Sequence, residues 1–308
     1  MIKMQTKKSL GLPREARAKW GQNFLRDRGI LKKIADFAQI EKEDTVVEVG
    51  PGEGTLTELL LERAKKVIAI EKDEKLVEFL KEKFAKEIKE EKLKIIAGDI
   101  LKVSEGVFEM PRSQKTPFDT YKVVGNIPYY ITGAIFKKFL EPKNQPSSIT
   151  FVVQKEVAER IMGSHFAKAS RDKKESILSI SIKVYGTPEF GGVIKAGSFC
   201  PKPKVDSAII AIRNISKSRF PRSDLKKCPK GQTLGISEVK FFKILKAGFA
   251  HKRKLLIKNL ILSQIRVSRT FLDMLKMKEI FEKCGISEKA RAENLKVENW
   301  VCLTKELV

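Results

Sequence analysis

The chain has few residues of the kinds that usually carry metals or act as nucleophiles. Among its 308 residues are only two histidines, His165 and His251, and four cysteines. The cysteines are spread along the chain without the paired spacing of a zinc or redox motif, which indicates free thiols: Cys200, Cys228, Cys284 and Cys302. Neither histidine lies near a suitable Cys or Ser. We therefore expect no metal site and no covalent catalysis by either histidine.

Long apolar runs are also missing. No stretch approaches the roughly 20 apolar residues that cross a bilayer, and the N-terminus has no apolar core of a secretory signal. We therefore expect a soluble, cytoplasmic protein with no membrane partner. The opening 19 residues are basic and poor in acids, which is typical either of a mitochondrial presequence or of an arm that contacts RNA. The second interpretation is favoured because functional residues follow at once.

Acidic residues are too few to balance the basic ones. Sixty-two Lys and Arg against 38 Asp and Glu give a net charge of +24 and a pI near 9.8. Basic residues concentrate at 3–33 and again around 243–258. This excess indicates a polyanionic partner, for which RNA, DNA and an anionic membrane all qualify.

Short apolar runs alternate with helical patterns over the first two thirds of the chain. Strands are expected at 45–49, 67–70, 93–97, 122–125, 149–154, 176–185 and 207–213. Helices are expected at 55–64 and 73–92, and everything from 237 onward has helical spacing. This alternation predicts a Rossmann-like α/β fold, a mostly parallel doubly wound sheet, with a small all-helical C-terminal domain.

A glycine loop after the first long strand indicates a cofactor site. Gly50 and Gly52 belong to a Gly-x-Gly-x-Gly run preceded by Glu48, a spacing that favours S-adenosylmethionine over a nicotinamide dinucleotide. Glu71 ends the next strand, where a carboxylate can accept from ribose hydroxyls. Asp99 follows the third strand and could accept from the adenine amine. Both acids could instead be solvated loop residues.

The loop Asn126-Ile127-Pro128-Tyr129 indicates the reaction class. The lone pair of an adenine amine is delocalised into the ring, so a catalyst must turn it toward the methyl donor. The side-chain oxygen of Asn126 and a backbone carbonyl at Ile127 or Pro128 could hold the amine, while Tyr129 offers a stacking face. Phe199 is a candidate second stacking face. Alternatively, Asn126 is a turn residue and Phe199 a core aromatic.

Together these motifs resemble the ribosomal RNA adenine N6,N6-dimethyltransferases of the bacterial KsgA/RsmA type. The motifs that carry the resemblance span nearly the whole chain: GQNFL at 21–25, EVGPGEG at 48–54, NIPY at 126–129, QKEVAER at 154–160, Phe199 with PKPKVDSA at 201–208, and RAENL at 291–295. The resemblance implies an S-adenosylmethionine site built from Gln22, Asn23, Leu25, Gly50, Gly52, Glu71, Asp99 and Asn126.

The resemblance also implies the substrate and the domain plan. The expected reaction is dimethylation of two adjacent adenosines near the 3′ end of small-subunit (16S) ribosomal RNA, on an immature small subunit, by a monomer. The expected domains are an N-terminal arm and cofactor lid at 1–33, a methyltransferase domain at 34–215, a linker at 216–235 and an RNA-binding helical domain at 236–308.

This chain differs from the family pattern in three places. The family usually has a Tyr-Gly ahead of a Leu-Ser pair, whereas this chain has Lys174-Glu175-Ser176-Ile177-Leu178-Ser179. Cys200 stands where a small hydroxyl residue is common, and 216–235 is longer and more basic than usual. Two alternatives remain at this stage: an Erm-type methylase of large-subunit RNA, and a ribosome-assembly factor that binds RNA without chemistry. The RAENL segment argues against the first, and intact Asn126, Glu71 and Asp99 argue against the second.

Overall fold

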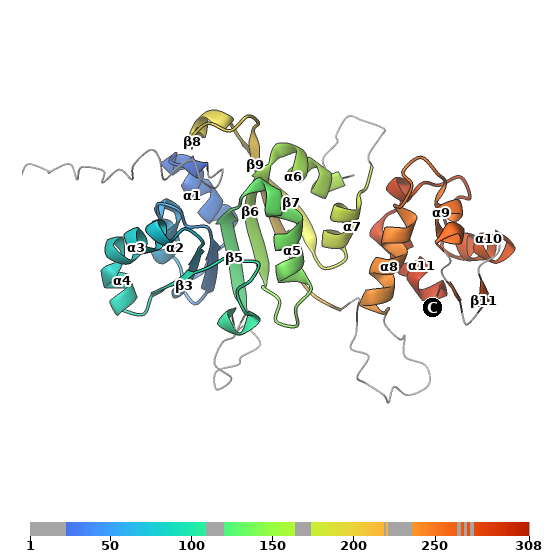
Figure 1. Cartoon of the computed structure of the whole chain (residues 1–308), viewed down its shortest axis with the longest axis horizontal. Coiled ribbons are helices and arrows are strands. Elements are labelled where there is room, and N and C mark those ends of the chain that lie inside the picture. Colours follow the sequence, from blue (N-terminus) through green and yellow to red (C-terminus); the bar gives the residue numbers. More distant parts are fainter. Residues whose placement is uncertain are drawn as a thin grey trace, which may run out of the picture.

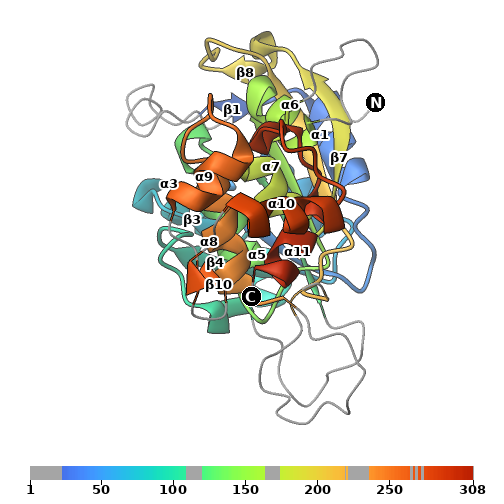
Figure 2. The same ribbon diagram turned by 90° about the vertical axis from the view of Figure 1, so that its right-hand side faces the viewer.

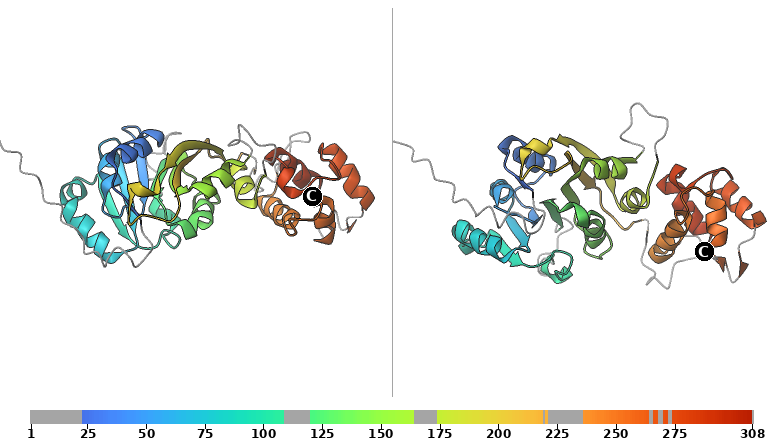
Figure 3. Two further views of the ribbon diagram at one scale, coloured as in Figure 1. Left: turned by 90° about the horizontal axis from the view of Figure 1, so that it is seen from above. Right: turned by 45° about the horizontal axis from the view of Figure 1, so that its top comes forward.

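The molecule consists of an α/β part and a smaller helical part that lie side by side along its long axis (Figures 1 and 3). The computed structural model describes residues 23–108, 120–163, 174–218, 220, 236–263, 266–267, 270–271 and 274–307. Within these ranges no helix is both long enough and apolar enough to cross a membrane.

A seven-stranded sheet forms the centre of the α/β part. Its strand order is β4-β3-β2-β5-β6-β9-β7. The strands are β2 (Thr45–Val49), β3 (Lys66–Glu71), β4 (Leu93–Ala97), β5 (Tyr121–Asn126), β6 (Ser148–Gln154), β7 (Thr187–Ile194) and β9 (Ser207–Arg213). The first five in this order are parallel, while β9 and β7 run antiparallel to their neighbours. The expected mostly parallel sheet is thus confirmed.

Helices cover both faces of the sheet, as Figure 1 shows. They are α1 (Arg28–Phe37), α2 (Thr55–Leu61), α3 (Glu74–Lys83), α4 (Ala85–Lys89), α5 (Thr132–Leu140), α6 (Lys155–Met162) and α7 (Ile177–Lys183). Successive strand residues point to opposite faces, so Val46 packs with α1, α2 and α3 while Val47 packs with α5, α6 and α7. Two apolar cores therefore hold the sheet, one on each face.

The prediction of a strand at 176–185 was wrong, because this segment forms helix α7. Ser176 caps the helix: its hydroxyl accepts from the Ser179 amide at 3.1 Å, and the Ser179 hydroxyl accepts from the Ser176 amide at 2.7 Å. This reciprocal cap offsets the weak helix propensity of the three isoleucines that follow. The strand at the edge of the sheet, next to β9, is β7 rather than the 176–185 segment. Pro188 and two glycines obscure the strand pattern of β7 in the sequence.

The long helix expected at 73–92 is broken into α3 and α4. The break lies at Phe84, whose φ of −111° is not helical. Its ring turns into the core beneath Gly54, where a Cβ atom would lie 2.6 Å from the ring. Burial of one aromatic ring against the glycine loop therefore interrupts the helix.

The C-terminal part packs four helices around Trp300, which is fully buried. They are α8 (Glu238–Gly248), α9 (Leu256–Leu262), α10 (Met274–Lys283) and α11 (Val297–Glu306), and this part faces the viewer in Figure 2. A two-stranded ribbon, β10 (Arg266–Val267) with β11 (Thr270–Phe271), is the one departure from an all-helical unit among its described residues. Gly248 allows α8 to approach Trp300, because a Cβ there would lie 2.4 Å from the indole.

The expectation of free thiols was wrong for two of the cysteines. Cys284, just after α10, and Cys302 in α11 are joined in a disulfide. They are 18 residues apart, a separation that matches no short motif, and only the packing of α10 on α11 brings them together. Cys200 is free and exposed, and Cys228 lies outside the described residues.

Among the described residues, hydrogen bonds and ion pairs join the α/β part to the helical part at two places. At one, the Tyr185 hydroxyl donates to Glu238, and the Lys217 amine donates to the same carboxylate at 2.9 Å. Burial, together with the bond to Glu238, raises the pKa of Tyr185, which keeps the phenol protonated as a donor. Ser216 to Ser218 of the predicted linker thus belong to this junction, while 219 and 221–235 lie outside the described residues.

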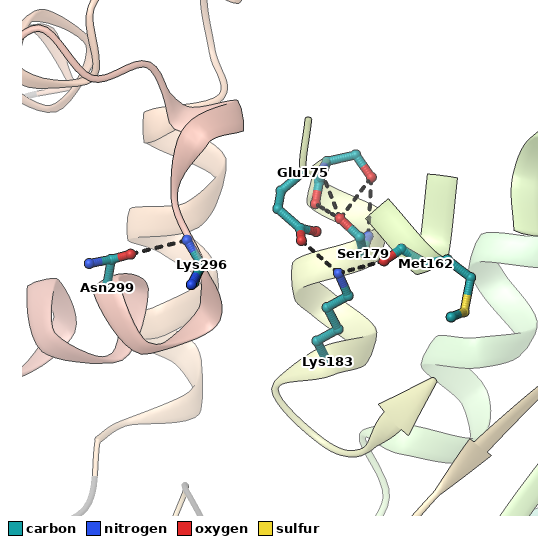
Figure 4. Close-up of polar contacts among 7 residues, drawn as sticks. Met162, Glu175, Ser179, Lys183, Lys296 and Asn299 are labelled. Atoms are coloured by element: carbon teal, nitrogen blue, oxygen red, sulfur yellow. Dashed lines mark hydrogen bonds and ion pairs between the residues drawn. The ribbon is translucent and has the colours of Figure 1, made fainter. Parts of the chain in front are cut away.

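The second junction involves the unusual Lys174-Glu175 pair. The Glu175 amide donates to the Glu293 carbonyl at 2.8 Å, and Lys174 pairs with the Glu293 carboxylate at 3.0 Å. The Glu175 carboxylate forms a buried ion pair with Lys183 at 2.6 Å, and Lys183 also donates to the Met162 carbonyl that ends α6 (Figure 4). Lys174 and Glu175, which belong to the segment that differs from the family pattern, therefore link α6, α7 and the 291–295 segment to one another.

Candidate active site

The candidate site lies where the parallel strands β2 and β5 end side by side. The chain runs from β2 to β3 and β4 on one side of β2, and then continues with β5 and β6 on the other side. The strand order therefore reverses between β2 and β5, which is the topological switch point where such sheets bind ligands. Val49 pairs with Gly125, and a Cβ on Gly125 would lie 2.6 Å from the Val49 carbonyl oxygen. Gly125 therefore lets the two loops after these strands meet.

The glycine loop depends on backbone conformations that favour glycine. Gly50, Gly52 and Gly54 have φ values of +67°, +57° and +74°. Space is limiting as well, because a Cβ on Gly52 would lie 2.8 Å from the Phe24 ring. Together these conformations expose the loop backbone to the cavity beside it.

Glu48 is a buried carboxylate beneath this loop. It is 1% exposed and borders the cavity, and the Thr57 hydroxyl donates to it at 2.6 Å. Burial raises the pKa of Glu48 to about 8, although the bond from Thr57 acts in the opposite direction. The glycine-loop motif by itself predicts no role for Glu48 beyond marking the loop. An acid inside an otherwise apolar strand was the signal that could have marked it as a site residue.

Glu71 and Asp99 end the next two strands and hold backbone turns in place. Glu71 accepts from the amides of Gly52 at 3.1 Å, Lys72 at 2.8 Å and Asp73 at 3.1 Å. Burial outweighs these bonds and raises the pKa of Glu71. Glu71 therefore ties the second strand end directly to the glycine loop.

Asp99 is more exposed than Glu71. Its carboxylate accepts from the Leu101 amide at 3.0 Å and from the Lys72 amine at 3.1 Å. Partial burial by itself would raise the pKa of Asp99, but these two donors lower it below its ordinary value. The carboxylate is therefore held ionised at the strand end.

The segment at 23–26 closes over the glycine loop. Strand β1 (Phe24–Leu25) pairs antiparallel with β8 (Phe199–Cys200), and the Thr55 hydroxyl donates to the Leu25 carbonyl at 3.3 Å. Arg26 contacts Glu53 with two nitrogens, at 2.7 and 3.2 Å, and this raises the pKa of Arg26. Gln22 lies outside the described residues.

The loop after β5 is fixed at three points. The Asn126 amide nitrogen donates to the Asn23 carbonyl at 2.9 Å, which leaves the side-chain oxygen to accept from a ligand. Ile127 is buried, and the Tyr129 hydroxyl shares a hydrogen bond with the Ser207 hydroxyl at 2.9 Å. The loop therefore has a defined shape before any ligand binds.

One cavity brings most of the predicted site residues together. Those that line it are Asn23, Leu25, Gly50, Gly52, Asn126, Ile127, Pro128 and Tyr129. Glu71 and Asp99 are not among the residues that line this cavity. Phe199 is 4% exposed and packs with Leu25 in the core beside α1, so it does not line the cavity either.

A second hollow lies between α5, α6 and α7 and the C-terminal part. This interdomain groove has a volume of about 1210 Å³. Its four acids each have a cationic partner: Glu141 with Lys137, Glu175 with Lys183, Glu238 with Lys217 and Glu293 with Lys174. Arg160, Lys243, Lys246 and Lys252 also line it, and none of them pairs with an acid among the described residues. The groove therefore carries uncompensated positive charge.

Among the described residues, no three His, Cys, Asp or Glu side chains gather in a way that could hold a metal ion. The cavity itself offers the carboxyl group of Glu48, the side-chain amide of Asn126 and glycine backbone.

Comparison with known proteins shows the family of the chain. Residues 14–307 match the family described as "Ribosomal RNA adenine dimethylase". A protein of Dehalococcoides mccartyi named "Ribosomal RNA small subunit methyltransferase A" is 39% identical over 295 residues, which are 95% of this chain and 89% of that protein. The Fusobacterium nucleatum protein of the same name is 36% identical, over 93% of this chain and 96% of that protein.

Two solved structures share the fold over both parts of the chain. A dimethyladenosine transferase from Plasmodium falciparum matches with a TM-score of 0.69 at 25% identity, covering 91% of this chain and 95% of that one. The 23S rRNA methyltransferase ErmE matches with a TM-score of 0.64 at 25% identity, covering 92% and 99%. The family match spans the glycine loop, the loop after β5 and the helical part, and the chain therefore belongs to the ribosomal RNA adenine dimethylases.

Proposed function

We propose that this protein transfers methyl groups from S-adenosylmethionine to N6 of two adjacent adenosines near the 3′ end of small-subunit ribosomal RNA, during maturation of that subunit. The observation that carries the proposal is the orientation of Asn126. Its amide nitrogen is held by the Asn23 carbonyl, so its oxygen is the group left to accept from a substrate amine.

Two acceptors would make the adenine amine reactive. The Asn126 oxygen takes one N–H, and a backbone carbonyl at Ile127 or Pro128 takes the other, which makes the nitrogen pyramidal and localises its lone pair toward the methyl donor. The Pro128 carbonyl already accepts from the Ile131 amide at 3.2 Å, and this favours Ile127 for the second role. Most of the rate would then come from positioning rather than from a strong base.

The cavity fits the chemistry of the cofactor. S-adenosylmethionine supplies an activated methyl group on a cationic sulfur and carries an ammonium group, and the carboxyl group of Glu48 borders the cavity as a candidate acceptor for that ammonium. In the proposal, Asn23, Leu25, Gly50 and Gly52 hold the cofactor in the cavity. Glu71 and Asp99 would take its ribose hydroxyls and adenine amine.

The positive interdomain groove supports RNA as the macromolecular substrate. Arg160 reaches it from α6, while Lys243 and Lys246 reach it from α8. Phosphates spaced along an RNA strand would neutralise these cations. We further propose that the protein acts as a monomer in the cytoplasm, where ribosomal subunits assemble.

The choice of subunit rests on the relatives. The Dehalococcoides and Fusobacterium proteins are named for the small subunit, whereas ErmE, which shares the fold at 25% identity, is named for 23S rRNA. An Erm-type activity is therefore the second candidate. An RNA-binding factor without chemistry is disfavoured, because Asn126 keeps both its donor and its acceptor in place.

Transfer of labelled methyl groups tests the proposal. The purified protein is incubated with labelled S-adenosylmethionine and either undermethylated small subunits or large subunits. We expect label in the small-subunit RNA only. Label in the large subunit alone would favour the Erm-type activity, and label in neither would favour a binding factor.

A further inference from the structure

Tyr130 is a large aromatic residue exposed beside the candidate active site. Its side chain belongs to the turn Tyr129–Ile131 and is 71% exposed. It makes no hydrogen bond or ring contact with another described residue. A single exposed apolar residue is ordinary, so the position and the stiffness of this one decide whether it has a role.

The turn that carries Tyr130 is anchored on both sides. The Thr132 hydroxyl donates to the Tyr129 carbonyl at 2.9 Å, and the Ile131 amide donates to the Pro128 carbonyl at 3.2 Å. Tyr129 is held by Ser207, and Ile131 packs against the core beneath. The Tyr130 ring therefore projects from a fixed backbone, and little conformational entropy is lost when something packs on it.

Along the chain, Tyr130 stands between residues that line the two hollows described above. Tyr129, one residue before it, lines the cavity, and Gly133, three residues after it, lines the interdomain groove. Gly133 lies in the first turn of α5, and residues three apart there are neighbours on one face. Apart from its chain neighbours and the backbone of its own helix, no atom lies within 4 Å of where a Cβ on Gly133 would stand, so the surface at Gly133 is open.

An RNA strand that runs from the groove into the cavity would pass this ring. When the target adenosine leaves its base stack to enter the cavity, its neighbour loses a stacking partner. An aromatic side chain can replace that partner, and such stacking changes affinity by about five- to a hundredfold per base. The proposed substrate has a second adenosine directly beside the first.

We propose that Tyr130 stacks on the nucleotide next to the target adenosine and so positions the strand for transfer. This inference rests on the proposed function for the identity of the RNA. It assigns Tyr130 a positioning role: the ring touches the neighbouring nucleotide, while Asn126 contacts the reacting amine.

Fluorescence of 2-aminopurine tests this contact directly. Substrate RNAs carry 2-aminopurine on the 5′ or the 3′ side of the target adenosine, and its emission falls when an aromatic ring stacks on it. The variants are Tyr130→Ala, which removes the ring, and Tyr130→Phe, which removes only the hydroxyl. The matched control is Leu275→Ala, because Leu275 is 76% exposed on α10.

We expect the wild type, Tyr130→Phe and Leu275→Ala to quench one of the two probes, and Tyr130→Ala to lose that quenching. The KM for RNA should rise about tenfold in Tyr130→Ala alone. Affinity for S-adenosylmethionine should stay unchanged, which a folding defect would not allow.

Equal quenching by Tyr130→Ala and the wild type would overturn the proposal. A loss of quenching in Tyr130→Phe as large as in Tyr130→Ala would also overturn it, because the contact would then be a hydrogen bond of the hydroxyl rather than stacking. The emission needs only RNA binding. A wild type that quenches the probe but transfers no methyl group would therefore contradict the proposed function and leave the stacking contact standing.

Discussion

The amide nitrogen of Asn126 donates to the backbone carbonyl of Asn23 at 2.9 Å, across 103 residues of sequence. This bond fixes which end of the Asn126 amide faces the ligand. It also links the 23–26 segment to the loop after β5, so cofactor and base would bind to a connected set of loops. The acceptor geometry needed for transfer therefore depends on both segments.

Substitutions can separate the two roles of the Asn126 side chain, whose amide nitrogen donates to the Asn23 carbonyl and whose oxygen would accept from the substrate amine. Asn126→Ala removes the acceptor, and Asn126→Asp keeps an oxygen but places a carboxylate against the Asn23 carbonyl. We expect both to lower kcat by at least about a hundredfold, the usual scale for loss of a group that orients the reacting atoms. Single-turnover methylation measures kcat, and a filter-binding assay should show RNA affinity within about twofold of wild type. Unchanged transfer in Asn126→Ala would remove Asn126 from its assigned role.

The bond between Tyr129 and Ser207 predicts a coupled pair. Tyr129→Phe and Ser207→Ala each break the same 2.9 Å hydrogen bond, so their effects on kcat/KM should not add. We expect a coupling of about 1 kcal/mol in a double-mutant cycle, since Ser207 is fully buried and its loss leaves the phenol unpaired. Additive effects would show that the bond does not position the Tyr129 ring.

Burial of Glu48 predicts a pH-dependent stability. Its pKa is about 8 in the folded protein and near 4.5 when unfolded, so the folded state holds one more proton between these values. The stabilisation is complete below pH 4.5 and is lost as the pH rises through 8. The shift of the Glu48 pKa from 4.5 to about 8 corresponds to a total stabilisation of about 5 kcal/mol.

Glu48→Gln removes this titration and can still accept from Thr57. Relative to the wild type, its free energy of unfolding should therefore increase steadily from pH 5 to pH 8. Urea denaturation at each pH measures the difference, and Glu82→Gln on the exposed face of α3 is the control. A difference that does not vary with pH would show that Glu48 titrates normally.

The groove cations predict the salt dependence of RNA binding. Lys243→Gln and Lys246→Gln should each reduce the slope of log affinity against log salt by about 0.7 to 0.9, if each lysine neutralises one phosphate. Lys289→Gln, an exposed lysine that does not line the groove, should leave the slope unchanged. Equal slopes for all three variants would exclude the groove as the path of the RNA backbone.

The strand ends of this fold could be predicted from the sequence because each strand is an apolar run that ends at a glycine or a polar residue. Gly50, Glu71 and Asn126 were found in this way, and the sheet brings them to one edge as expected. Phe199 shows the limit of such reasoning. An aromatic in a motif can stack on a ligand or fill a core, and here the pairing of β8 with β1 buries it.

Long-range packing explains the other differences. The alternation at 176–185 fits a strand, and only the Ser176–Ser179 cap and packing against α6 make it a helix. The disulfide between Cys284 and Cys302 follows from the packing of two helices that no local pattern places together. The pKa of Glu48 likewise depends on burial by elements distant in sequence.

Nucleoside mass spectrometry of small subunits directly tests whether this protein dimethylates two adjacent adenosines of small-subunit ribosomal RNA. Undermethylated small subunits are incubated with the protein and S-adenosylmethionine, and the RNA is digested in fragments that locate the product. The account predicts N6,N6-dimethyladenosine at two adjacent positions near the 3′ end and none in large subunits treated in parallel. Monomethyladenosine as the final product, or dimethyladenosine in large-subunit RNA, would contradict it.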